Sequence, residues 1–257
     1  MTEEGAVSPE STRSAWTLLR PEDLPALPDT RLEVHYGVQL LASFGQAMVP
    51  SRSDDSHRSM RWDAMLPGFR SETSGTGELD VSLHVPTFSL EVRRSRTVVS
   101  TVPLSGARPG NARDRLQEIL RNATGQSVDL AWPEYDLPAR DGSWDRALTP
   151  DAGALKTLAA WFGNAALVLA ALTMDVRQAS PVRCWPHHFD IASLLTFPRE
   201  AEADPAHVGL GLSPGDAPGD LPYFYVNGWP APDPSDLTPL PPPARWNTDG
   251  WVGAVLA

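Results

Sequence analysis

The stretch LDVSLHVPTFSLEVRRSRTVVSTV, residues 79–102, decides the fold of this chain. Apolar and polar side chains alternate over residues 79–85 and again over 88–92, and residues 98–102 are mostly β-branched. Alternation with a period of two is typical of a strand that buries one face. Because such short connections join only antiparallel neighbours, we predict that these residues form an antiparallel meander.

Three segments around the meander have helical character. Residues 31–49 carry apolar side chains about four positions apart and are followed by Pro50, and residues 111–122 present one apolar face. Residues 151–174 form a nearly continuous apolar run, and the Thr-Pro-Asp sequence at 149–151 is typical of a helix start. We therefore predict three main helices.

The remaining strand candidates are shorter. Residues 51–62 are predicted to be a loop that leads into a short strand, and residues 182–185 and 223–226 are predicted strands. Residues 190–197 suit either a short helix or a strand, and residues 251–256 return to the core. Helices and runs of strands are segregated, so the predicted fold class is α+β, with an antiparallel sheet of the meander and C-terminal strands packed by three main helices.

The length of 257 residues suffices for a substantial core. Residues 1–28 are acidic and rich in serine and proline with little periodicity, so we predict a disordered tail there. Residues 29–257 are predicted to form a single α+β domain.

Charge and cysteine content exclude several classes of function. A net charge of −11 disfavours binding to nucleic acid and to anionic membrane surfaces, because both need basic side chains. The single cysteine cannot form an internal disulfide, and the N-terminus lacks the pattern of a signal peptide. Lys156 and Asn164 interrupt the long apolar segment, which favours a core helix over a membrane span. We therefore expect a soluble, cytoplasmic protein.

Potentially reactive side chains are concentrated in PVRCWPHHFD, residues 181–190. His187, His188 and Asp190 would suit a divalent metal such as zinc or ferrous iron, and the further candidates for this site are His57 and Asp216. In the alternative interpretation Trp185 and Phe189 pack in the core, the histidines bond backbone carbonyls, and Asp190 caps a following helix.

Three other features also leave alternatives open. Cys184 is either a nucleophile with His187 or His188 as its base, or a small buried residue. The sequence SPGD at residues 213–216 either holds a cation or a ligand hydroxyl, or forms a turn. The sequence DDSH at residues 54–57 either orients the histidine and shares a metal, or caps a turn.

The segments SPVRCWPHHFDIA (residues 180–192), SPGD (213–216) and YFYV (223–226), with Trp229 and Pro230, resemble an uncharacterised bacterial family of unknown function. The resemblance covers roughly the last third of the chain, with residues 54–57 as weaker support. It implies a shared fold and a shared pocket, without an activity.

Two functional hypotheses follow from these patterns. The first is a small-molecule-binding protein or an enzyme with a pocket around Trp185–Asp190, where residues 54–57 and 213–216 also meet. The second is a non-catalytic structural or protein-interaction protein in which this segment is core. Convergence of the three polar segments around one concave pocket would distinguish them.

Overall fold

The computed structural model describes residues 16–138, 143–199, 204–216 and 220–257. Its main helices are α2 (Leu27–Met48), α3 (Pro109–Thr124) and α4 (Ala152–Thr173), with short 3-10 helices η1 (Pro21–Ala26), η2 (Ser56–Arg58), η3 (Ser143–Asp145) and η4 (Pro234–Asp236). The strands are β1 (Met60–Asp63), β2 (Gly68–Ser71), β3 (Leu79–His84), β4 (Ser89–Arg94), β5 (Thr97–Pro103), β6 (Arg183–Trp185), β7 (Asp190–Phe197), β8 (Ala206–Ser213), β9 (Tyr223–Trp229), β10 (Arg245–Asn247) and β11 (Gly253–Leu256).

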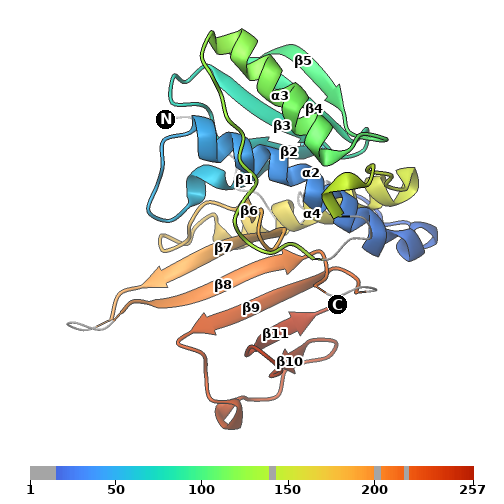
Figure 1. The fold of residues 1–257 in the computed structure, drawn as a ribbon. Coiled ribbons are helices and arrows are strands. Elements are labelled where there is room, and N and C mark those ends of the chain that lie inside the picture. Colours follow the sequence, from blue (N-terminus) through green and yellow to red (C-terminus); the bar gives the residue numbers. More distant parts are fainter. Residues whose placement is uncertain (1–15, 139–142, 200–203, 217–219) are drawn as a thin grey trace, which may run out of the picture.

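These strands form one antiparallel sheet in the order β10-β11-β9-β8-β7-β6-β1-β2-β3-β4-β5. The pairing of β1 with β6 joins two halves, and each half runs outward from this central pair (Figure 1). The predicted meander is β3-β4-β5, and β1 and β2 extend it toward the centre of the sheet. The α+β class, with an antiparallel sheet packed by three main helices, is confirmed.

The predicted helices correspond to α2, α3 and α4, with shifted starts. The N-cap of α4 is Asp151, whose Oδ1 accepts hydrogen bonds from the backbone N–H groups of Gly153 (2.9 Å) and Ala154 (2.8 Å). Thr149 is therefore not the cap. The helix begins later because the Asp151 carboxylate satisfies two N–H groups that the first turn leaves unpaired.

The predicted tail at residues 1–28 lies partly outside the described residues, namely at 1–15. Residues 16–28, by contrast, include η1 and the first turn of α2. Thr17 and Asn164 exchange two hydrogen bonds of 2.9 and 2.8 Å, and the Thr157 hydroxyl donates to Asp23 (2.9 Å). This part of the segment is attached to α4 through these polar contacts, and Leu24, Ala26 and Leu27 pack in or against the core. Polar contacts leave no hydrophobic periodicity in the sequence.

The C-terminal half of the sheet resolves one open alternative. Residues 190–197 form β7, so the interpretation of Asp190 as the cap of a following helix is wrong. Strand β8 was not predicted, because Gly209 and Gly211 interrupt its apolar pattern. Strands β7, β8 and β9 extend beyond the helices that cover the other half (Figure 1).

Helix α4 lies in the core. It is long and apolar enough to cross a membrane by length and composition, with a mean hydropathy of 1.5, but half of its most apolar window is buried in the protein. It contacts α2, β1, β7 and β8. Leu158, Phe162 and Leu169 are buried on this helix. This packing is that of a core helix, as the sequence predicts.

An aromatic cluster connects this core to the β6–β7 turn. The ring of Phe189 lies 4.9 Å from that of Phe162 in α4, 5.6 Å from Phe69 in β2, and 5.2 Å from His35 in α2, measured between centroids. Phe189 thereby fixes the turn against both helices and the centre of the sheet.

Candidate functional site

The turn between β6 and β7 consists of residues 186–189 and divides its side chains between core and surface. Phe189 adopts a left-handed backbone conformation with φ of 57°, and its N–H donates to the Trp185 carbonyl (2.8 Å). Its ring and Pro186 are buried, whereas His187 and His188 are exposed. Only part of this segment is core, and the histidines face away from the buried aromatic cluster.

Helix α2 holds the turn through one carbonyl. Pro186 O accepts hydrogen bonds from His35 Nε2 (2.8 Å) and Gln39 Nε2 (2.9 Å). The Tyr135 hydroxyl donates to Gln39 Oε1 (2.6 Å), which orients the amide. Burial lowers the pKa of His35 to about 4, so this ring is neutral near pH 7 and carries its proton on Nε2.

A first cavity of about 290 Å³ is lined by residues of α2, of the turn and of the SPGD segment, including Arg31, His35, His187, His188 and Asp216. Desolvation also lowers the pKa of His187 to about 4, so this exposed ring is neutral near pH 7.

The SPGD turn closes one end of this cavity. Arg31 Nη1 donates to the Pro214 carbonyl (3.0 Å) and to the Asp220 carbonyl (3.3 Å). Gly215 has φ of 105°, and a Cβ there would lie 2.0 Å from Arg31 Nη1. The residue must be glycine for both reasons. The segment is a turn, and its final residue, Asp216, also lines the cavity.

A second cavity of about 450 Å³ lies over strands β7, β8 and β9. Its lining combines carboxyl groups, hydroxyl groups and aromatic rings: His188, Asp190, Ser213, Asp216, Tyr223, Tyr225, Asn227 and Trp251. His188 and Asp216 line both cavities. We call the two together the His188 cleft.

Three glycines, Gly209, Gly211 and Gly253, lie directly beneath side chains that line the second cavity. A Cβ on Gly211 would lie 2.7 Å from Tyr225 Oη, and a Cβ on Gly209 would lie 2.4 Å from Asn227 Oδ1. Large side chains of β9 therefore lie directly across the backbone of β8. On β11, Gly253 makes the same room for the Trp251 ring, 2.3 Å from the position of a Cβ. We call these three residues the glycine floor.

Tyr225 crosses Gly211 to reach Asp190 on the strand beyond. Its hydroxyl donates to Asp190 Oδ2. The other carboxyl oxygen, Oδ1, is buried and has no hydrogen-bond partner among the described residues. Burial raises the pKa of Asp190, and burial together with the neighbouring Asp190 raises the pKa of Tyr225. Burial therefore makes ionisation of each group less favourable than it is in water.

Asp216 differs from Asp190 because both of its oxygens have partners. Ser213 Oγ donates to Oδ1 (3.0 Å), and the Tyr223 hydroxyl donates to Oδ2. The second cavity thus holds two tyrosine–aspartate pairs, and one buried oxygen, Asp190 Oδ1, remains unpaired.

The proposed metal ligands do not form a coordination set. The rings of His187 and His188 lie 4.3 Å apart between centroids, and His188, Asp190 and Asp216 share one cavity. Within the described ranges, however, no group of three His, Cys, Asp or Glu side chains could hold a metal ion. The described part of the chain therefore offers the expected divalent metal no set of three such ligands.

Cys184 is fully buried, and burial raises the pKa of its thiol well above the usual range. A buried thiol without a thiolate is a poor nucleophile. The structure therefore favours the alternative of a small packed residue on β6.

His57 does not belong to the cleft. It is 2% exposed, and its Nδ1 accepts a hydrogen bond from the Arg52 N–H (3.2 Å). Asp54 Oδ1 accepts from the Ser56 N–H (3.1 Å), the pattern of a capped turn. Of the three segments expected to converge, residues 185–190 and 213–216 meet, and residues 54–57 do not line either cavity.

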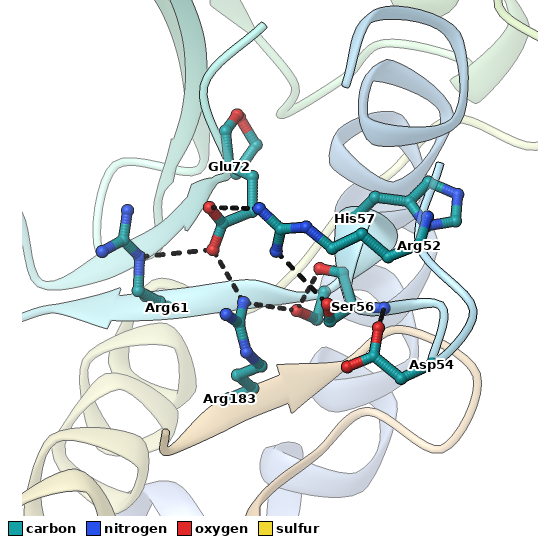
Figure 2. Close-up of polar contacts among 9 residues, drawn as sticks. Arg52, Asp54, Ser56, His57, Arg61, Glu72 and Arg183 are labelled. Atoms are coloured by element: carbon teal, nitrogen blue, oxygen red, sulfur yellow. Dashed lines mark hydrogen bonds and ion pairs between the residues drawn. The ribbon is translucent and has the colours of Figure 1, made fainter. Parts of the chain in front are cut away.

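The loop beside His57 belongs to an ion-pair cluster centred on Glu72 (Figure 2). Arg183 Nη1 lies 2.7 Å from the Glu72 carboxylate, and Arg52 and Arg61 each lie 3.7 Å from it. Arg183 also donates to Ser59 Oγ (3.0 Å). These contacts attach the loop and β6 to the edge of β2, which is a structural role.

Sequence reasoning missed four residues that line the cleft, three in β9 and one just before β11: Tyr223, Tyr225, Asn227 and Trp251. One signal was present: the spacing Tyr-x-Tyr-x-Asn puts three polar side chains on one face of a strand. The Gly-x-Gly spacing at 209–211 is its counterpart, because glycines on one strand leave room for large residues on the next.

No family model, curated protein or solved structure matches this chain.

Proposed function

We propose that the protein binds a small organic molecule in the second cavity of the His188 cleft. The observation that carries this proposal is that Asp190 lines the cavity and that its buried Oδ1 has no hydrogen-bond partner among the described residues. A buried polar atom without a partner destabilises a protein by about 1–3 kcal/mol. A hydrogen-bond donor on a ligand would satisfy it.

The composition and size of the cavity support the same proposal. Its walls combine a few polar groups with aromatic rings, and a volume of about 450 Å³ suits a small ligand. The Tyr225 and Trp251 rings lie 6.3 Å apart between centroids and stand nearly perpendicular, at 77°. The sheet beneath them keeps these walls in place.

Binding rather than a specific reaction is the function we propose. His188 and Asp190 could exchange protons with a ligand, since both line the cavity. The thiol of Cys184, the chain's one cysteine, is buried away from it.

We further propose a cytoplasmic protein that binds neither nucleic acid nor membranes. The free Cys184 suits a reducing compartment, and the net charge of −11 opposes contact with polyanions.

A ligand screen with matched variants tests the binding proposal. Thermal-shift measurements on a library of small polar compounds select hits, and calorimetry measures their affinities. We expect hits to bind the wild type and Trp229→Leu equally, because Trp229 is 64% exposed and outside the cavity. Trp251→Leu should lower the affinity of the hits by about tenfold or more. A screen without hits, or equal binding to both variants, would contradict the proposal.

A further inference from the structure

We infer that the ligand of the second cavity is a small organic cation, an amine or guanidine compound with an apolar body. This inference rests on the proposed binding function. It follows from the two carboxyl groups, the three aromatic rings of Tyr223, Tyr225 and Trp251, and the absence of lysine and arginine from the described lining residues.

The charge of Asp216 is the first step in the argument. The hydrogen bonds that its carboxylate accepts come from two neutral hydroxyl groups, those of Ser213 and Tyr223. These bonds orient the carboxylate without neutralising it. Arg31 shares the first cavity with Asp216 and interacts with it electrostatically, and Arg245 shares a third cavity with it, but neither arginine lines the second cavity. The charged groups that face a ligand in the second cavity are therefore carboxyl groups, which favour cations over anions.

The aromatic walls supply the second step. The faces of tyrosine and tryptophan rings carry negative partial charge and attract ammonium and guanidinium groups within about 6 Å of the ring centre. Tyr225 and Trp251 meet edge to face, so they form a corner at which a cation and its apolar substituents both find contacts.

The unpaired oxygen of Asp190 supplies the third step. An ammonium or guanidinium group has only donors, so it can satisfy Oδ1 without bringing an acceptor into the buried site. A carboxylate or phosphate ligand would instead place acceptor oxygens against Asp190 and Asp216. Complementarity of both charge and hydrogen bonding thus favours the cation.

Three compounds of similar shape separate charge from size: 2-phenylethylamine as the cation, 2-phenylethanol as the neutral compound and phenylacetate as the anion. Their affinities for the full chain would be measured by calorimetry near pH 7. We expect the amine to bind at least about tenfold more tightly than the alcohol, and the acid not to bind.

Two variants test the assigned groups. Asp216→Asn should reduce the preference for the amine over the alcohol by about tenfold, while Trp251→Leu should weaken binding of the amine. Asp236→Asn, an exposed carboxylate on η4, is the matched control and should bind as the wild type does. Thermal midpoints verify that each variant is folded.

The outcomes separate this inference from the binding proposal. If the alcohol or the acid binds as tightly as the amine or more tightly, the inference of a cationic ligand is wrong, but the cavity still binds a small molecule. The same conclusion follows if the library screen yields neutral or anionic hits whose binding is lost in Trp251→Leu. A failure of the three compounds together with an empty library screen would overturn the binding function itself.

Discussion

The clamp on the β6–β7 turn predicts a specific loss of stability in acid. His35 is 3% exposed, and burial lowers its pKa from 6.5 to about 4 in the folded protein. In the unfolded chain the ring takes up a proton below its usual pKa, whereas in the folded protein it stays neutral. The stabilising effect is therefore complete above the usual pKa of 6.5 and is lost as the pH falls toward 4.

The magnitude follows from the two pKa values. One pKa unit corresponds to about 1.4 kcal/mol, so the contribution that depends on His35 falls by about 3 kcal/mol between pH 7 and pH 4. His35→Gln does not titrate, and its amide can still donate to the Pro186 carbonyl. The wild type should therefore lose about 3 kcal/mol more than the variant over this range.

Urea unfolding of both proteins at a series of pH values measures this difference directly. Carboxylates titrate in both proteins, so their effect cancels in the comparison. His207→Gln changes a partly buried residue near the start of β8. It serves as a control that shows how the loss of a histidine elsewhere alters the pH dependence of stability. A difference between wild type and His35→Gln that changes by less than about 1 kcal/mol would refute the assignment of a buried neutral ring.

Three further predictions concern the framework around the cleft. Leu169→Ala should lower the free energy of unfolding by about 2–5 kcal/mol, because Leu169 is 1% exposed in α4. Urea unfolding measures this loss, and a loss below about 0.5 kcal/mol would show that α4 is peripheral to the core. Glu72→Gln should lower the free energy of unfolding by about 3 kcal/mol, since three arginines would lose the carboxylate that they surround. If the loss comes from repulsion among these arginines, high salt should make it smaller. Cys184 should react with a thiol reagent only at the rate of unfolding; fast labelling of the native protein would disprove its burial.

Hydrophobic periodicity predicted the parts of the fold whose side chains are packed against one another. The meander at residues 79–102 and the three helices follow from it, because alternation and four-residue spacing directly report buried faces. Strand β8 escaped prediction for the opposite reason. Gly209 and Gly211 carry no side chains to bury, and their function is to make room for residues of β9.

The candidate site was predicted in part. Residue chemistry pointed to His188, Asp190 and Asp216, which line one cavity. The same reasoning grouped them with His57, which lies in another part of the structure, because residue type carries no information about distance. The partner of Asp190 is Tyr225, thirty-five positions later in the chain, and only the strand order β7-β8-β9 brings the two together.

In the glycine floor, a single glycine-to-alanine substitution, which adds one methyl group, could change the shape of the cavity. At Gly209 the obstacle to a Cβ is the end of the Asn227 side chain, so alanine there would turn this amide and reshape the wall above it. At Gly211 a Cβ would also meet the Ile191 carbonyl at 2.7 Å, so the backbone itself resists the change. A substitution at Gly209 can thus alter the shape of the cavity, while Gly211 preserves the contact between Tyr225 and Asp190.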